Sequence, residues 1–336
     1  MITPSPQSLQ PEDWQKQQAQ AISDPRQLLQ LLELPTSLLG GAQRATQTFP
    51  LRVTRHFLGL MEKGNPHDPL LRQVLPLGEE LLAHPDYLDD PVGDAAAALG
   101  NGILHKYHGR ALLITTGACG VHCRYCFRRN YPYAEDNATR HWQGMLDQLA
   151  EMPQIDEVIL SGGDPLTLSD RRLAELLERL QAMPQLQRLR IHSRQPVVLP
   201  ARITPQLTQM LGDCRLHTSL VLHCNHPAEL APELQARLER LRAAGVTLLN
   251  QSVLLKGVND DPEILAKLSE TLFGFGVLPY YLHQLDRVSG AQHFAVGDRQ
   301  AHALHETLRK RLPGYLLPRL VREIAGEASK TPLAET

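Results

Sequence analysis

Cysteine and lysine are both scarce in this chain of 336 residues, which has 5 cysteines and 7 lysines against 27 arginines. The formal net charge of −2 gives no excess of positive charge that would attract nucleic acid or an anionic membrane. No apolar run approaches the roughly 18–20 residues that a membrane helix requires, and the polar N-terminus lacks the apolar core of a signal peptide. We therefore expect a cytoplasmic protein that binds neither nucleic acid nor membranes.

The few cysteines are unevenly distributed along the chain. Cys119, Cys123 and Cys126 lie within eight residues, whereas Cys214 and Cys224 lie far from them. An odd number of cysteines cannot be fully paired, and tight clustering is typical of metal ligands rather than of a disulfide framework. The sequence therefore predicts a metal site on one loop.

Short apolar runs alternate with amphipathic helical patterns from about residue 110 onward. The runs span residues 111–116, 157–160, 189–192, 219–223, 247–254 and 277–282. They are continuous rather than alternating, which is typical of strands buried on both faces, and they recur at roughly the length of a βαβ unit. We therefore predict an α/β fold with a partial TIM-type (β/α)6 parallel barrel. A doubly wound open sheet is the alternative.

The leucine pattern also predicts individual helices and the division of the chain. Leu173, Leu176, Leu177 and Leu180 mark one face of a helix that Ser169 or Asp170 would cap. The first hundred residues carry helical, proline-punctuated patterns and no strand signal. We divide the chain into a helical N-terminal region (1–100), a core barrel (101–313) and a C-terminal segment (314–336).

The loop after the first predicted strand reads GACGVHCRYCFRR (117–129), with the cysteine spacing C-x3-C-x2-C. Three thiolates can hold three irons of a 4Fe–4S cluster and leave the fourth iron open to a ligand that is not protein. A structural zinc site normally needs four protein ligands, and electron-transfer clusters usually use four cysteines. The loop therefore favours a cluster that takes part in chemistry, with zinc binding as the competing hypothesis.

This loop resembles the signature of the radical S-adenosylmethionine (SAM) superfamily. In that superfamily the open iron chelates SAM, and one electron from an external flavodoxin- or ferredoxin-type reductant cleaves SAM to a 5′-deoxyadenosyl radical. The segment Ser161-Gly162-Gly163-Asp164-Pro165 resembles the glycine-rich segment that contacts the SAM amine. The resemblance implies cluster ligands Cys119, Cys123 and Cys126, and SAM contacts from Tyr125, Gly162, Gly163, Asp164, Ser193, His223 and Gln251.

From about residue 100 to the C-terminus the chain resembles the lysine 2,3-aminomutase family, which also uses pyridoxal phosphate (PLP). The stretches HCNHP (223–227), NQSVLLKGVND (250–260) and LPYYLHQLD (278–286) carry this resemblance. It assigns Lys330 as the catalytic lysine that forms the internal aldimine with PLP, and Lys256 is the alternative. A lysine so near the terminus would otherwise be interpreted as a solvated charge.

The same resemblance implies the remaining site residues. It places Arg110 and Lys106 on the PLP phosphate, although the family prefers arginine at the position of Lys106. Arg128 matches the residue that binds the substrate carboxylate, and Asp286 and Glu323 match the two that bind the ammonium of L-lysine. The family has aspartate at the second of these positions, so Glu323 retains the charge and reaches one methylene further.

The implied activity is that of an isomerase that moves the α-amino group of L-lysine to the β-carbon and gives (R)-β-lysine. Because the chain ends soon after Lys330, it resembles the bacterial members whose product a lysyl-tRNA-synthetase-like ligase attaches to elongation factor P. One alternative is a radical SAM enzyme that acts on another amino acid or on a protein-bound lysine. The other is a non-catalytic zinc or iron–sulfur module.

The positions of these residues along the predicted strands support a shared site. The cysteine loop, Gly162, Gly163, Asp164, Ser193, His223, Gln251 and Asp286 all lie at or near the C-terminal ends of successive predicted strands. Barrel enzymes assemble their active sites at that end. We therefore expect these side chains to meet around one cavity.

Overall fold

A continuous sheet runs through the computed structural model, which describes residues 13–133 and 138–333 and orders nine strands from β1 to β9. Strands β2 to β8 are parallel to one another, while β1 and β9 join the two edges in antiparallel orientation. The strands are β1 (Ile103–Tyr107), β2 (Arg110–Thr116), β3 (Glu157–Gly162), β4 (Arg188–Ser193), β5 (His217–His223), β6 (Thr247–Val253), β7 (Leu278–His283), β8 (Arg319–Arg322) and β9 (Thr331–Pro332).

The six strands expected from the sequence are β2 to β7, and each overlaps its apolar run. Each is followed by at least one helix before the next parallel strand begins, which gives six β/α units. The sheet order is linear, so the sheet curves without closing on itself among the described residues. The prediction of a partial (β/α)6 barrel is therefore confirmed.

Three strands were not expected. The four residues of β8 carry an arginine at each end, and β9 has only two residues. Neither strand therefore shows a periodic pattern of apolar residues in the sequence. Strand β1 combines two apolar residues with His105, Lys106 and Tyr107 and returns into β2 through Gly109, whose φ is +74°. These strands form because β7 and β2 offer open hydrogen-bonding edges, which the local sequence does not reveal.

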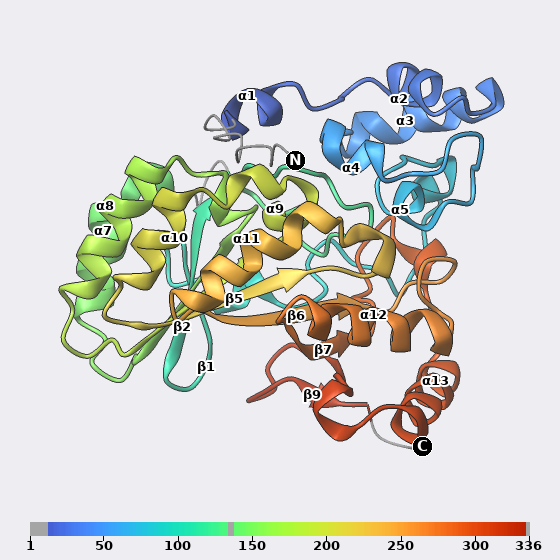
Figure 1. Ribbon diagram of the computed structural model, residues 1–336. Helices are drawn as coiled ribbons and strands as arrows, with labels where there is room; N and C mark the ends of the chain where they lie inside the picture. The colour runs from blue at the N-terminus through green and yellow to red at the C-terminus, as the bar shows by residue number, and fades with distance from the viewer. Residues whose placement is uncertain (1–12, 134–137, 334–336) are drawn as a thin grey trace, which may run out of the picture.

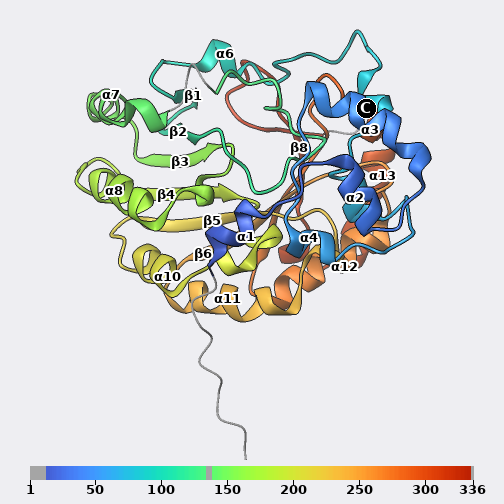
Figure 2. The same cartoon turned by 90° about the horizontal axis from the view of Figure 1, so that it is seen from above.

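The barrel helices lie on the outer side of the strands (Figure 1, Figure 2). They are α7 (Ala138–Ala150), α8 (Asp170–Gln181), α9 (Gln195–Val198), α10 (Pro205–Gly212), α11 (Pro232–Ala243), α12 (Pro262–Gly274) and α13 (Asp298–Arg311). Helix α8 buries its four leucines, and its N-cap is Ser169, whose side chain accepts a hydrogen bond from the Arg172 amide. Of the helices that the structure describes, none is long and apolar enough to cross a membrane.

The residues before the sheet form short helices joined by loops. These are α1 (Trp14–Ala19), α2 (Pro25–Leu31), α3 (Leu39–Thr48), α4 (Arg55–Gly59), α5 (Pro69–Arg72) and α6 (Asp94–Ala97). Helices α2 to α5 lie above the sheet in Figure 1. Their apolar side chains share a buried cluster with Val121 of the cysteine loop and Val198 of α9. The division of the chain into three parts remains a prediction.

Helix α8 offers a direct test of the core. Leu176 is fully buried between this helix and the sheet, so Leu176→Ala is expected to lower the free energy of unfolding by about 2–5 kcal/mol. Glu178→Ala, on the exposed face of the same helix, is expected to change it by less than about 0.5 kcal/mol. Urea denaturation measures both values, and equal losses in the two variants would contradict this placement of Leu176.

Candidate active site

One cavity of about 610 Å³ collects every site residue expected from the sequence. Its lining includes Cys119, Cys123, Cys126, Tyr125, Gly162, Gly163, Asp164, Ser193, His223, Gln251, Lys106, Arg110, Arg128, Asp286, Glu323 and Lys330. By contrast, Lys256 is exposed and lies outside this lining. Cysteines and a lysine amine that are about 200 residues apart in the chain therefore face one space.

The loop after β3 holds one side of the cysteine loop. The Gly163 amide donates to Thr116 O at 2.7 Å and the Asp164 amide donates to Ala118 O at 2.8 Å. A Cβ on Gly162 would lie 2.6 Å from Thr116 O, and one on Gly163 would lie 2.4 Å from Ala118 O. Both positions therefore require glycine because backbone approaches backbone there, whether or not a ligand also binds.

The N-terminal region holds the other side of the cysteine loop. Glu80 receives two hydrogen bonds from the Arg124 guanidinium, at 2.9 and 2.6 Å, and one from Arg129 at 2.8 Å. The Arg124 and Glu80 side chains are completely buried. The amides of His122 and Arg124 also donate to backbone oxygens of this region. The loop is thus fixed between two parts of the chain.

The three thiols of the cysteine loop need positive charge nearby to ionise together. Burial and the neighbouring thiols raise the pKa of Cys119 well above its usual range and that of Cys126 to about 11. Three thiolates side by side therefore require positive charge among them, which bound metal supplies. In the described ranges no three His, Cys, Asp or Glu side chains are grouped to hold one metal ion.

Asp164 joins the ends of β3 and β4. Its carboxylate accepts hydrogen bonds from the Ser193 hydroxyl at 2.7 Å and from the Arg194 and Gln195 amides at 2.8 and 2.9 Å. Burial raises the pKa of Asp164, although these hydrogen bonds oppose the shift. Asp164 and Ser193 therefore have a structural role, linking the ends of β3 and β4, in addition to any contact with SAM.

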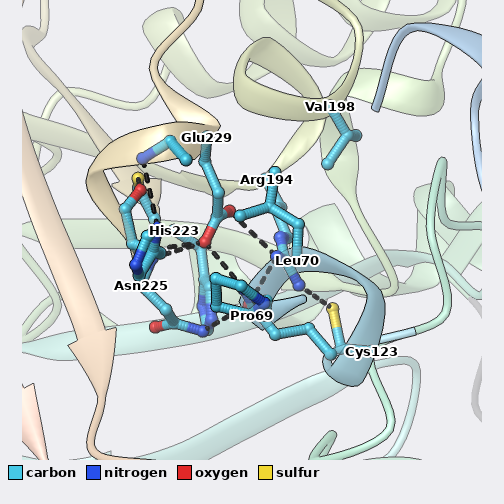
Figure 3. Close-up of polar contacts among 12 residues, drawn as sticks. Pro69, Leu70, Cys123, Arg194, Val198, His223, Asn225 and Glu229 are labelled. Atoms are coloured by element: carbon cyan, nitrogen blue, oxygen red, sulfur yellow. Dashed lines mark hydrogen bonds and ion pairs between the residues drawn. The ribbon is translucent and has the colours of Figure 1, made fainter. Parts of the chain in front are cut away.

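A buried arginine at the end of β4 contacts the cysteine loop (Figure 3). Arg194 Nη1 lies 2.8 Å from Cys123 Sγ and 2.6 Å from the Tyr125 hydroxyl, and Nη2 lies 2.9 Å from Glu229 Oε2. The Tyr125 hydroxyl is also 2.9 Å from His223 Nε2. Burial and then Arg194 lower the pKa of His223 to about 3, so its ring is neutral at physiological pH.

At the other end of the cavity, carboxylates alternate with cations. Lys330 Nζ lies 2.5 Å from Glu323 Oε2, and Lys106 Nζ lies 3.1 Å from Glu323 Oε1 and 2.6 Å from Asp94 Oδ1. Asp94 Oδ2 then accepts from Arg128 Nε at 2.6 Å. The β8–β9 hairpin creates the first of these pairs because it turns Lys330 back onto Glu323.

Two carboxyl groups in this region have opposite pKa shifts. Burial opposes ionisation of Glu323, but Lys330 and Lys106 outweigh it and lower the pKa of Glu323 to about 2. Burial, with the charge of Glu323, raises the pKa of Asp286 to about 7. Asp286 is therefore the group here that titrates near neutral pH, while Glu323 stays ionised.

The same end of the cavity has the charge that an anionic cofactor needs. Arg110, Arg190 and Arg319 line it from β2, β4 and β8, and the Tyr281 ring lies 5.9 Å from Lys330 Nζ. The buried Nε2 of His192 has no hydrogen-bond partner in the described structure. A phosphorylated aromatic aldehyde such as PLP fits this set, since it offers a phosphate for arginine and a carbonyl carbon for the lysine amine.

Several lining or contacting residues were not identified from the sequence, namely Asp94, Arg190, His192, Arg194, Glu229, Tyr281 and Arg319. Asp94 lies in an alanine-rich stretch that gives no motif. Arg190 and His192 belong to a predicted strand, where an inward-facing polar pair was the available signal. Arg194 and Glu229 pair across 35 residues of sequence, so only the fold brings them together.

Known proteins resemble both the cysteine segment and the whole chain. Residues 101–190 match a family described as a 4Fe-4S single cluster domain. The L-lysine 2,3-aminomutase of Escherichia coli K12 is 50% identical, with 96% of this chain and 94% of that protein aligned. The protein of the same name from Haemophilus influenzae is 46% identical, with 96% of each aligned.

A more distant relative has the same name, and one solved structure shows a weak likeness. The L-lysine 2,3-aminomutase of Clostridium subterminale is 34% identical over 96% of this chain and 77% of its own length. A solved radical SAM methyltransferase from Sphaerobacter thermophilus is 17% identical, with a TM-score of 0.46 over 66% of this chain and 68% of that chain, a likeness too distant to bear on function. At 50% identity over nearly its whole length, the chain belongs to the L-lysine 2,3-aminomutase family.

Proposed function

We propose that this protein isomerises L-lysine to (R)-β-lysine with a 4Fe–4S cluster, SAM and PLP. The observation that carries the proposal is the single cavity that contains both the cysteine loop and Lys330. When bound, the cluster and SAM supply a radical that removes a hydrogen atom, and PLP supplies a ring that delocalises the unpaired electron. The two cofactors must act on one substrate, and one shared cavity allows that.

At the cluster end, Cys119, Cys123 and Cys126 would each bind one iron. Their loop is fixed on both sides by backbone contacts and by the Arg124–Glu80 pair, so the three thiols start from a defined arrangement. Tyr125, Gly162, Gly163, Asp164, Ser193, His223 and Gln251 would surround SAM between the cluster and the substrate. A flavodoxin- or ferredoxin-type protein would supply the electron.

At the lysine end, Lys330 would bind PLP covalently through its amine. Arg110 would bind the phosphate, and Arg190 and Arg319 line the same space. Lys106, whose amine is occupied by Asp94 and Glu323, would contribute its charge to this end rather than a dedicated phosphate contact. The Glu323 carboxylate orients the Lys330 amine through their 2.5 Å ion pair.

The substrate contacts follow from the charges. Arg128 is held through Nε by Asp94 and through Nη1 by Ser161, so its remaining donor can meet the substrate carboxylate. Asp286 and Glu323 would bind the distal ammonium of L-lysine. An amino acid without a distal ammonium offers no positive charge to the two buried carboxyl groups. Its binding is therefore disfavoured.

The product would serve in the modification of elongation factor P by a lysyl-tRNA-synthetase-like ligase, in the cytoplasm. The support is the sequence resemblance described above, together with identities of 50% and 46% to the Escherichia coli and Haemophilus influenzae proteins against 34% to the Clostridium protein. Transfer of the enzyme's own product to elongation factor P by that ligase tests this step separately.

The reaction itself is tested with reconstituted enzyme under anaerobic conditions. Incubation with L-lysine, SAM, PLP and a chemical reductant is expected to yield (R)-β-lysine, detected by chiral amino-acid analysis. Alanine and glutamate, which lack the distal ammonium, serve as control substrates. Cleavage of SAM without β-lysine formation would contradict the proposal and favour a radical SAM enzyme with another substrate.

The assignment of the PLP lysine is tested by two matched variants. Lys330→Ala is expected to abolish the visible absorption that PLP gains when it bonds to a lysine amine, since that amine lines the cavity. Lys256→Ala is expected to retain it because Lys256 lies on the surface. Absorption that survives in Lys330→Ala and disappears in Lys256→Ala would reverse the assignment.

The raised pKa of Asp286 predicts a pH dependence of lysine binding. Only the ionised carboxylate attracts an ammonium, so the affinity for lysine should fall about tenfold for each pH unit below about 7. The neighbouring carboxyl groups Glu323 and Asp94 have lowered pKa values, so both stay ionised over this range in the wild type and in Asp286→Asn. Isothermal titration calorimetry of the holoenzyme without reductant should show that the affinity for lysine depends on pH in the wild type. In Asp286→Asn this pH dependence should be lost. An equal pH dependence of the affinity in both proteins would exclude Asp286 as its cause.

A further inference from the structure

We propose that Arg194 is a positioning residue for Cys123 and that the Arg194–Glu229 pair sets the reduction potential of the cluster. The inference rests on the 4Fe–4S cluster of the proposed function and concerns residues that the cysteine motif does not include. Arg194 follows β4 directly, and Glu229 ends the short 3₁₀ turn Pro227–Glu229 after β5. Both lie outside the cysteine loop.

The Arg194 guanidinium is fully occupied on its two terminal nitrogens. Nη1 donates to Cys123 Sγ at 2.8 Å and to the Tyr125 hydroxyl at 2.6 Å. Nη2 donates to Gln73 Oε1 at 2.7 Å and to Glu229 Oε2 at 2.9 Å. The residue is only 7% exposed, so water cannot replace these partners without opening the fold.

Glu229 holds the second terminal nitrogen of the Arg194 guanidinium, while Cys123 and the Tyr125 hydroxyl share the first. Glu229 is 0% exposed, and its Oε1 accepts from the amides of Asn225 and His226 and from Gln73 Nε2, each at 3.0 Å. The other oxygen is left for Arg194, as Figure 3 shows. The backbone of Arg194 is fixed as well, because its amide donates to Asp164 Oδ2.

This arrangement has an electrostatic consequence for a cluster ligand. A hydrogen bond from a cation to a ligating sulfur stabilises negative charge on that sulfur, and one-electron reduction adds negative charge to the cluster. Hydrogen bonds to the sulfurs, nearby charge and solvent exposure are among the factors that set cluster potentials. Arg194 should therefore raise the reduction potential, and Glu229 should reduce that effect by neutralising Arg194.

The two members of the pair consequently predict shifts of opposite sign. In Arg194→Gln the positive charge is lost and the donor to Cys123 becomes a neutral amide, so the potential should become more negative. In Glu229→Gln the negative charge is lost while the amide oxygen can keep the three donors on Oε1. Arg194 retains Cys123 and Tyr125 on Nη1 and Asp164 on its amide, so the potential should become more positive. A purely structural role would not separate the two variants by sign.

The experiment measures the midpoint reduction potential of the cluster in the reconstituted enzyme, without SAM or lysine. The redox titration is monitored by electron paramagnetic resonance. Arg194→Lys, which keeps the charge with fewer donors, should fall between the wild type and Arg194→Gln. Arg202→Gln is the matched control, because Arg202 is a fully buried arginine that pairs with Asp170 and its hydrogen bonds do not reach the cysteine loop. Its potential should equal that of the wild type.

The proposal is overturned if Arg194→Gln has the wild-type potential, if both Gln variants shift in the same direction, or if Arg202→Gln shifts as far as Arg194→Gln. If Arg194→Gln and Arg194→Lys fold, as judged by circular dichroism, but lose iron that Arg202→Gln retains, the positioning of Cys123 by Arg194 is supported. Absence of a 4Fe–4S cluster or of β-lysine in the wild type would instead refute the proposed function.

Discussion

The buried ion pair between Arg124 and Glu80 is the contact on which the cluster loop depends. Both side chains are completely removed from water, and Glu80 also accepts from Arg129 on the far side of Cys126. Removal of one member of such a pair leaves an unpaired buried charge, which costs about 3–5 kcal/mol. The loop is therefore fixed by charges supplied from outside it, and the three cysteines are presented before any metal binds.

The same principle organises the opposite end of the cavity. Asp94 and Glu323 pair with Lys106, Arg128 and Lys330 in a connected series of ion pairs. Asp286 lines the same cavity outside this series, and burial together with the charge of Glu323 raises its pKa to about 7. A substrate with one carboxylate and a distal ammonium matches the two unfilled positions, one on Arg128 and one on Asp286.

The sequence predicts the central sheet well because each of β2 to β7 overlaps a short apolar run between helical patterns. Burial on both faces is found along all of β3, whereas β4 and β6 alternate buried with partly exposed residues. The sequence does not predict β8 and β9, whose pairing depends on the open edge of β7. That omission matters for the site, since the β8–β9 hairpin is what holds Lys330 against Glu323. The expected site residues come from motif resemblance, whereas Asp94, Arg194 and Glu229 have no motif and gain their roles from partners 34 to 71 residues away.

These distant partners also show that the N-terminal region does more than shield the barrel from solvent. Residues 101–190, which match the 4Fe-4S single cluster domain, contain the cysteine loop and the glycines that pack against it. They lack Glu80 and Asp94, which neutralise Arg124 and Arg128. Since an unpaired buried arginine is strongly unfavourable, the cysteine segment needs the N-terminal helices to keep its own arginines in place, and these helices thereby share in building the active site.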